Sequence, residues 1–390
     1  MRLKPGRQMN LSDRVKNIAQ SEIRAMSILC HEKKGLNMAQ GICDLDVPLV
    51  VQEGARIAIS NGKNIYTSAY GNLELREAIA KKQNDFYQQG ISEDNVLVSS
   101  GATGAFYAMA MSLLNEGDEV IVFEPYYGYH VSTLESLGCK VKFIKTLPPS
   151  YEVDFEYLES QITPQTKALL ICNPSNPSGK VYTKEELQSI GSILSKNEVL
   201  LFSDEMYEHF VYDDLEFVSA LSIDTLKDRT VVISGFSKIY SITGWRLGYA
   251  ISSAEVIDAA SAINDLVYVC PAAPLQYGVL KGLQELPKSY YENVAKEHED
   301  KRNRFITALN EVGLKAQYVK GAYYVLADIS TLEGKDDKQK VVSLLEKTGI
   351  ATVPARAFYH DSKGLNLARF CFSKTDAEID QAIASLQKLV

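Results

Sequence analysis

A serine and a lysine that directly follow a β-branched run, with an arginine eight residues beyond the lysine, have the types and spacing of chemically active residues. Residues 234–249 read SGFSKIYSITGWRLGY and contain Ser237, Lys238 and Arg246. A lysine amine is almost fully protonated at neutral pH, so it becomes a nucleophile only where burial or a nearby cation lowers its pKa. Arg246 can be that cation, or it can bind a phosphate with the Ser237 hydroxyl as a further donor. We therefore expect one site that presents an amine and binds an anion.

The elements that position this site are short apolar runs that alternate with helical patterns. The runs cover residues 96–98, 120–123, 141–144, 168–171, 199–202, 230–233 and 247–251. This alternation predicts an α/β fold whose mostly parallel sheet has seven strands and binds ligands beyond the carboxyl ends of those strands. Lys238 follows the sixth run and is therefore expected at that edge.

Composition narrows the class of protein. An apolar fraction of 46%, a charged fraction of 23% and a net charge of −8 are those of a globular protein and argue against a nucleic-acid partner. No apolar run reaches the roughly 20 residues that span a bilayer, so no membrane association is expected. The six cysteines are scattered, without CxxC or histidine pairing at ligand spacing, which indicates no metal site and reduced thiols in the cytoplasm.

The central stretch resembles the Schiff-base motif of pyridoxal-phosphate enzymes of the aspartate aminotransferase fold, fold type I. The motif S-K-x-x-x-x-x-G-x-R-x-G is matched by Ser237, Lys238, Gly244, Arg246 and Gly248. The resemblance implies pyridoxal 5'-phosphate (PLP) as cofactor, with Lys238 as its covalent anchor and with Ser237 and Arg246 at its phosphate. The chain departs from many relatives at residue 235, where it has glycine and they have a second phosphate-binding serine.

Three further segments resemble cofactor-binding elements of the family. Residues 99–104, SSGATG, precede an apolar helix expected at 105–114, and free N–H groups at a helix start favour an anion. In register with the family, Ala102 and Thr103 hold the phosphate. Tyr127, in EPYY, stacks on the pyridine ring. Tyr66, in IYTSAYGNLELR, matches a tyrosine that reaches the phosphate of the other subunit across a homodimer interface.

Two loops after apolar runs carry the expected contacts to the pyridine ring. Residues 173–179, NPSNPSG, place Asn176 as a donor to the 3-oxygen of the cofactor and beside the substrate. Residues 203–207, SDEMY, place Asp204 at the protonated pyridine nitrogen and Tyr207 at the 3-oxygen. A carboxylate after a buried strand is costly unless it is paired, and helix capping is the alternative role of Asp204.

The substrate contacts come from opposite ends of the chain. Residues 39–48, AQGICDLDVP, match a family segment in which Gly41 presents its N–H to the substrate carboxylate. Arg369, in LARFCF, matches the arginine that binds the α-carboxylate bidentately. Aromatic residues expected near the site, Tyr127, Tyr240 and Phe358, suit aromatic or neutral substrate side chains, and no second cation for a dicarboxylate is located.

The domain organisation follows from the same pattern. We expect an arm at 1–45 that packs with the small domain, a large PLP-binding domain at 46–287 and a small α+β domain at 288–390. Apolar spacing predicts a helix from Ser12, its N-cap, to Cys30. The charged stretch 289–313 predicts a long helix with a solvated face. Residues 321–326 and 350–353 are expected as strands of the small domain.

The resemblance implies an aminotransferase that moves an amino group between an L-amino acid and a 2-oxo acid. Lys238, Asp204 and Tyr207 are its expected catalytic residues. The same scaffold hosts C–S lyases, decarboxylases and synthases, which remain alternatives. A ligand-sensing domain of a transcription regulator is a further alternative. It is disfavoured because only about 40 residues precede the Gly41 segment, fewer than the basic DNA-binding helices of such a regulator need.

Overall fold

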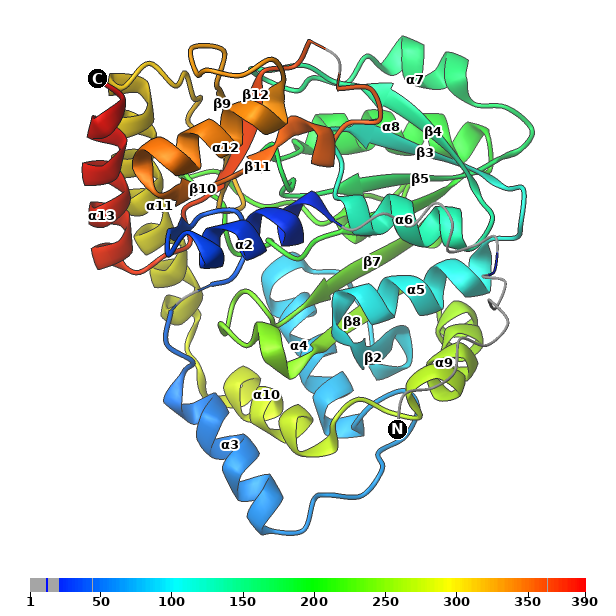
Figure 1. The fold of residues 1–390 in the computed structure, drawn as a ribbon. Helices are drawn as coiled ribbons and strands as arrows, with labels where there is room; N and C mark the ends of the chain where they lie inside the picture. The colour runs from blue at the N-terminus through cyan, green and yellow to red at the C-terminus, as the bar shows by residue number, and fades with distance from the viewer. Residues whose placement is uncertain (1–11, 13–20, 44, 363) are drawn as a thin grey trace, which may run out of the picture.

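The computed structural model of the chain describes residues 12, 21–43, 45–362 and 364–390 (Figure 1). Its strands are β1 Leu36–Asn37, β2 Val96–Ser100, β3 Glu119–Glu124, β4 Lys140–Lys145, β5 Thr166–Cys172, β6 Leu200–Asp204, β7 Thr230–Gly235, β8 Leu247–Ile251, β9 Tyr324–Asp328, β10 Ile350–Ala351, β11 Val353–Pro354 and β12 Leu367–Cys371. The seven runs expected as strands of the main sheet are confirmed as β2 to β8.

The α-helices in the described residues are α2 Glu22–Glu32, α3 Leu49–Ser60, α4 Leu73–Tyr87, α5 Gly101–Leu113, α6 Gly128–Ser136, α7 Phe155–Gln161, α8 Lys184–Lys196, α9 Ala254–Tyr268, α10 Ala273–Glu285, α11 Lys288–Glu311, α12 Asp337–Thr348 and α13 Asp376–Leu386. The expected helix from Ser12 overlaps α2, which follows Ser21, but residues 13–20 lie outside the described residues.

The large sheet has the order β2-β8-β7-β6-β5-β3-β4. All neighbouring pairs from β7 to β4 are parallel, whereas β8 runs antiparallel to both β7 and β2. The carboxyl ends of the parallel strands therefore share one edge with the amino end of β8. This reversal brings Arg246, the residue before β8, to the edge that also carries Asp204 and the residues after β7.

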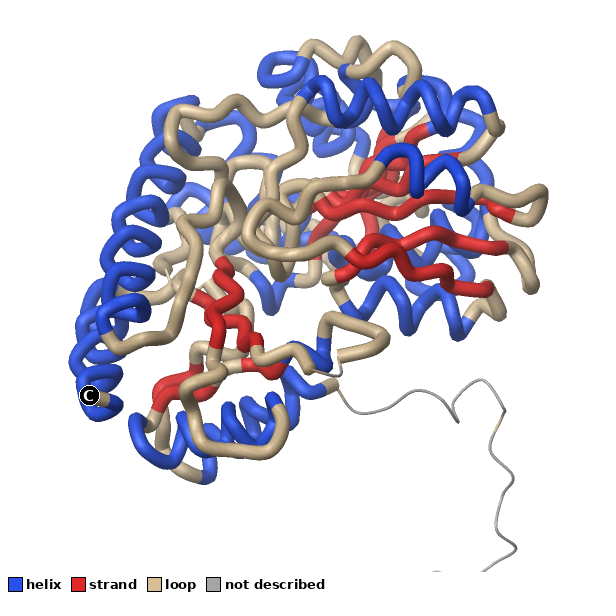
Figure 2. The backbone as a smooth tube through the Cα atoms, turned by 90° about the horizontal axis from the view of Figure 1, so that it is seen from above, coloured by secondary structure: helices blue, strands red, loops and turns tan. Residues whose placement is uncertain are grey.

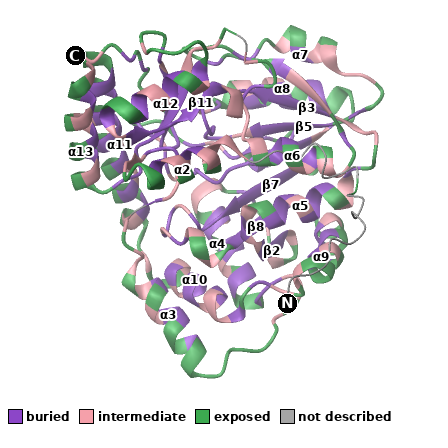
Figure 3. Cartoon of the chain, in the orientation of Figure 1, coloured by how far each residue is buried: buried purple, intermediate pink, exposed green. Residues whose placement is uncertain are grey.

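Both faces of the large sheet are buried, which explains its uninterrupted apolar runs. Alternate residues of one strand enter different cores: Val231 and Ile233 pack with α5, α6 and α9, whereas Val232 packs in the core on the opposite face. Leu169 and Ile171 of β5 pack against α8. Figure 3 shows the strands buried and the outer sides of the helices exposed.

A second group of strands lies apart from the large sheet (Figure 2). β9, β12 and β11 form an antiparallel sheet with β12 in the centre, and β1 pairs in parallel with β10. The expected strand at 321–326 begins at Tyr324, and the expected strand at 350–353 is two short strands. Chain segments from both ends thus meet in this lobe, and β12 carries Arg369.

The helix α11 corrects the expectation of a mainly solvated charged helix. Its residues Tyr291, Val294, His298, Phe305 and Leu309 are buried at helical spacing, so one face belongs to the core. The charged composition hid this face because two cations, at positions 301 and 302, are themselves buried on it.

Candidate active site

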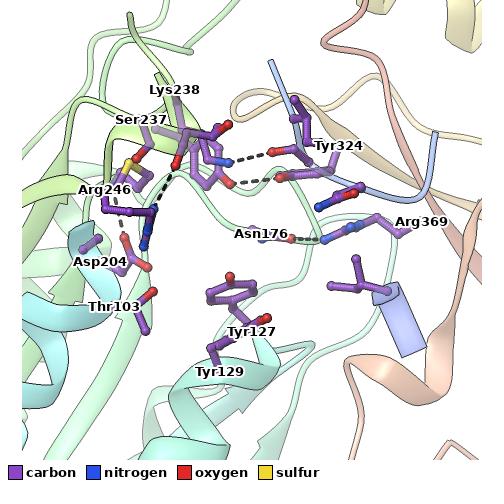
Figure 4. Close-up of a pocket in the computed structure, with 18 of the residues that line it drawn as sticks. Thr103, Tyr127, Tyr129, Asn176, Asp204, Ser237, Lys238, Arg246, Tyr324 and Arg369 are labelled. Carbon is purple, nitrogen blue, oxygen red and sulfur yellow. Dashed lines mark hydrogen bonds between the residues drawn. The ribbon is translucent and has the colours of Figure 1, made fainter. Parts of the chain in front are cut away.

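A cavity of about 510 Å³ opens at the carboxyl edge of the large sheet (Figure 4). It gathers most of the residues expected in the site: Gly41, Ala102, Thr103, Tyr127, Asn176, Asp204, Tyr207, Ser237, Lys238, Arg246 and Arg369. Tyr66 is not among them; its side chain is 79% exposed in the loop between α3 and α4. Residues from the large sheet, the α2 segment and the small lobe therefore meet in one cavity.

Lys238 lies just beyond β7, and its amine is directed into this cavity. Its Nζ donates a hydrogen bond of 2.7 Å to the carbonyl oxygen of Gly41. Burial lowers the pKa of Lys238 from its ordinary value of 10.5 to about 8, with the cations Arg369 and Arg246 acting in the same direction. A substantial fraction of the amine is therefore neutral near physiological pH, as a nucleophile requires.

One end of the cavity is built to receive an anion. The helix α5 begins at Gly101, four residues earlier than expected, so Ala102 and Thr103 lie in its first turn, where N–H groups lack intrahelical partners. Arg246 packs directly against this turn. Its guanidinium is so close to Gly101 that a Cβ atom added there would lie only 2.4 Å from it. Gly101 also has a φ of +73°, which glycine adopts most easily.

The two glycines on facing strands allow this close approach. A Cβ atom at Gly248 would lie 2.3 Å from the backbone nitrogen of Ala102. A Cβ atom at Gly235 would lie 2.9 Å from the Cα of Gly248. A side chain at 235 would therefore require a shift of one of these two strands in this chain.

At the bottom of the cavity, Asp204 is held by a buried histidine. His130 Nε2 lies 2.9 Å from Asp204 Oδ2, and both side chains are at least nine-tenths buried. The other oxygen, Oδ1, accepts a 3.1 Å hydrogen bond from the backbone N–H of Met206. No described helix begins directly after Asp204, so this contact closes a local turn and is not the helix cap considered as an alternative.

The wall opposite Arg246 carries Arg369 and Tyr324, with Tyr127 between the two ends (Figure 4). Arg369 is 1% exposed; its Nη1 donates to Asn176 Oδ1 at 2.8 Å and its Nη2 to the carbonyl of Ala39 at 2.6 Å. Its Nε has no hydrogen-bond partner among the described residues. Because a buried donor without a partner is costly, this arginine is suited to a ligand that accepts hydrogen bonds.

Two tyrosine hydroxyls meet at this wall. The hydroxyl groups of Tyr207 and Tyr324 are 3.0 Å apart, and burial followed by the proximity of Tyr324 raises the pKa of Tyr207 well above its ordinary value. Tyr324 also places its ring 4.3 Å from the guanidinium carbon of Arg369. A Cβ atom at Gly41 would lie 1.8 Å from the Tyr324 hydroxyl, so a side chain at 41 would displace the Tyr324 ring.

Several cavity residues were not found by sequence reasoning. Among them are Tyr324, Tyr129, Ile23, Arg24 and Gln40, which line the cavity. His130, which contacts Asp204 from behind the lining, was also missed. His130 lies three residues after Tyr127 on α6, at helical spacing, which was a usable signal; the others come from segments that only the fold brings near. The placement of Tyr240 near the site was wrong: it is fully buried and its hydroxyl lies 2.7 Å from that of Tyr291. Phe358 packs on Arg369, 4.9 Å from its guanidinium, behind the cavity.

The site has a half-buried lysine at the carboxyl edge of a mostly parallel sheet. On one side of it lies a helix start with an arginine, and on the other a second, buried arginine. These features are those of a PLP enzyme of fold type I. The chain belongs to the family of class I and II aminotransferases, which its sequence matches over residues 33–386. The enzymes of this family depend on PLP, and this chain is such an aminotransferase.

Relatives support this assignment over nearly the whole chain. An aspartate aminotransferase of Thermotoga maritima is 37% identical over 330 residues, which cover 84% of this chain and 85% of the relative. A methionine aminotransferase of Escherichia coli is 30% identical over 365 residues, 93% and 94% of the two chains. The solved structure of aspartate aminotransferase from Thermus thermophilus with maleate superposes with a TM-score of 0.92 at 30% identity, covering 98% of this chain and all of that one.

The residues of the cavity fit PLP. The first turn of α5 and Arg246 suit its phosphate, the buried Asp204 suits a protonated ring nitrogen, and the amide nitrogen of Asn176 remains a donor because its oxygen accepts from Arg369. Within the described ranges, His, Cys, Asp and Glu side chains form no group of three or more that suits a metal ion. Every helix that the structure describes is too short or too polar to cross a bilayer.

Proposed function

We propose that this aminotransferase moves an amino group between an L-amino acid and a 2-oxo acid through Lys238, which anchors the cofactor and transfers the substrate proton. The observation that carries this proposal is the buried Lys238 amine, with its pKa lowered to about 8, between two anion-binding ends of one cavity. A neutral amine is both a nucleophile for an aldehyde and a base for a carbon acid.

The cofactor-binding roles follow from position. Ala102 and Thr103 N–H groups, the Ser237 hydroxyl and Arg246 would hold the phosphate. Tyr127 would cover one face of the ring, and Tyr207 and Asn176 would donate to the 3-oxygen. Asp204, oriented by His130, would keep the ring nitrogen protonated. When bound, PLP supplies an electron sink for the electron pair left at the substrate Cα.

The substrate would bind between the lysine and Arg369. The free Nε of Arg369 and the donor groups around it suit a carboxylate. Gly41 would add its backbone N–H, which has no hydrogen-bond partner in the described part of the chain. This orientation presents the Cα proton to Lys238 Nζ. The lysine would remove this proton and deliver it to the cofactor carbon that is bonded to the same nitrogen.

The proposal is tested by locating the cofactor. Borohydride reduction followed by peptide mass analysis is expected to find a phosphopyridoxyl group on Lys238, and Lys238→Ala is expected to lose both that group and the yellow colour. Lys140→Ala, at an exposed lysine of β4, is the control. A modified lysine elsewhere would contradict the assignment. Formation of a new amino acid in a one-to-one ratio with the 2-oxo acid product distinguishes transamination from lyase or decarboxylase chemistry.

We further propose a homodimer in which Tyr66 reaches the partner's cofactor. Large apolar side chains are exposed around α3, the loop after it and α9: Leu49 81%, Ile65 78%, Tyr66 79% and Leu266 78%. Exposed apolar side chains in such number favour association. A twofold interface is isologous, so each chain would complete the site of the other.

The remaining expectations stay proposals. The division into an arm at 1–45, a large domain at 46–287 and a small domain at 288–390 is supported by the pairing of β1 with β10, which joins residues 36–37 to the C-terminal lobe. A cytoplasmic location is supported by the six cysteines, all of which are free thiols. Limited proteolysis near residue 287 and cell fractionation test the two proposals.

A further inference from the structure

Five charged residues line the active-site cavity, and the proposed reaction employs four of them. Asp204 serves the ring nitrogen, Arg246 the phosphate, Arg369 the α-carboxylate and Lys238 the covalent link. The fifth is Arg24, on the first turn of α2. The charged groups of the cofactor and the α-carboxylate of the substrate are assigned to the other four residues, so none of them would neutralise the charge of Arg24.

Arg24 also has no partner among the residues that the structure describes. Its guanidinium makes no hydrogen bond, ion pair or ring contact with any residue that the structure describes, although its helix neighbour Glu22 is paired with Lys338 at 2.9 Å. The side-chain amide of Gln40, which lines the same part of the cavity, likewise has no hydrogen-bond partner among the described residues. Two sets of donors therefore face the cavity with unused capacity.

The position of Arg24 marks where a substrate side chain would leave the site. A second cavity, of about 520 Å³, runs along α2 and shares with the first one Ile23, Arg24, Gln40 and Tyr129. Tyr129 lies beside Tyr127, with the two rings 5.3 Å apart and nearly parallel (Figure 4). A side chain that points away from Lys238 along Tyr129 therefore meets Arg24 and Gln40 at the junction of the two cavities.

We propose that Arg24, assisted by Gln40, binds the carboxylate at the end of the substrate side chain, so that this enzyme prefers dicarboxylic amino and oxo acids to neutral ones. A charge-assisted contact with a planar guanidinium matches a carboxylate in geometry and in charge. The open second cavity gives room for acids longer than aspartate. The inference rests on the proposed function only for the pose of the substrate, and it names a second cation, which could not be located from the sequence.

The test compares substrates of equal shape and different charge. Each amino acid alone is mixed with the PLP-loaded enzyme, and the second-order rate constant of the absorbance change is measured. The rate constant for glutamate is compared with that for glutamine, and the rate constant for 2-aminoadipate with that for norleucine. Arg24→Gln is expected to lower the acid-to-neutral ratio about ten- to a hundredfold, the range of one charge-assisted hydrogen bond. Lys33→Gln, which removes a positive charge from the end of the same helix outside both cavities, is expected to leave the ratio unchanged.

A binding measurement separates this inference from the proposed reaction. Glutarate is a dicarboxylate without an amino group, and its binding is measured by calorimetric titration. We expect it to bind more weakly to Arg24→Gln than to the wild type and to regain part of its affinity in Arg24→Lys. The affinity for butyrate is expected to stay near the wild-type value in both variants. An acid-to-neutral ratio or a glutarate affinity that Arg24→Gln leaves at the wild-type value overturns the inference. If no amino acid reacts with wild-type enzyme, the proposed function fails, and the glutarate titration still decides the role of Arg24.

Discussion

The reactivity of Lys238 depends on its surroundings more than on its own chemistry. The amine is buried, hydrogen-bonded to a single carbonyl and flanked by two arginines at opposite ends of the cavity. Burial penalises its charged form, and the arginines add repulsion in the same sense. The same lysine in an exposed loop would be protonated and inert at neutral pH.

This environment predicts a pH dependence of cofactor uptake by apoenzyme. Below the pKa of about 8 the amine is protonated and has no free electron pair, so the rate of covalent attachment should rise with pH and level off above the pKa. Rates of absorbance recovery after PLP addition between pH 6.5 and 10 measure this profile. A midpoint above pH 10 would show that burial does not activate the amine.

Asp204 is expected to matter far more for turnover than for folding. Asp204→Ala removes the group proposed at the ring nitrogen, an electrostatic contribution of several kcal/mol, so kcat should fall by about a thousandfold or more. The loss of the contacts to His130 and Met206 N–H should cost only about 1–3 kcal/mol of folding free energy.

Asp204→Asn provides the comparison, because it keeps the shape and one acceptor oxygen without the charge. Steady-state kinetics and denaturant unfolding of both variants measure the two effects separately. Wild-type turnover in Asp204→Ala would limit this carboxylate to a structural role in the turn at Met206.

Among the elements, β8 and α5 form the anion-binding end together. Because β8 runs against its neighbours, its amino end lies at the catalytic edge, and Gly248 lets the first turn of α5 approach its backbone. The free N–H groups of this turn then point at the space beside Arg246. The element pair, rather than any one side chain, creates the positive end of the cavity.

Gly248→Ala is therefore expected to displace the first turn of α5 and weaken PLP binding at least tenfold, because its new methyl group would lie 2.3 Å from Ala102 N. Fluorescence titration of apoenzyme with PLP measures the affinity. Gly128→Ala, at the start of α6, is the matched control, since its Cβ atom would meet only Ala357 O at an ordinary 3.6 Å. Equal affinities in the two variants would contradict the proposed role of this contact.

At the scale of the molecule, the site described in one chain has no contribution from Tyr66. That tyrosine lies in a separate hollow with Arg76 and Tyr277, on the face that carries the exposed apolar side chains. This placement fits the proposed homodimer, in which Tyr66 would reach the cofactor of the partner chain.

Mixed dimers test this arrangement. Lys238→Ala and Tyr66→Ala homodimers should each be impaired, the first completely and the second through weaker PLP binding. After subunit exchange, the hybrid should contain one complete site, formed by Lys238 of one chain and Tyr66 of the other, and activity at limiting PLP should recover. Native mass spectrometry verifies the exchange. Verified hybrids without recovery would place Tyr66 in the site of its own chain.

The sequence by itself determined the strands, the edge on which the site lies and the main chemical groups. Buried parallel strands are short, uninterrupted apolar runs, and the loops after them carry polar residues. Lys238, Asp204 and Asn176 could therefore be predicted as site residues without coordinates. The family motifs then predicted their roles.

Only the tertiary structure decided which further residues complete the cavity. Arg24 and Tyr324 lie on a helix and a strand whose local patterns are those of ordinary packing, and no local feature indicates that they face the cavity. The space beside Gly235 and Gly41 is limited by Gly248 and Tyr324, which lie more than ten residues away in the chain. The local sequence determines whether a segment forms a helix or a strand and which of its faces is apolar. Which residues of different elements come into contact depends on long-range packing. These contacts could therefore be seen only in the folded chain.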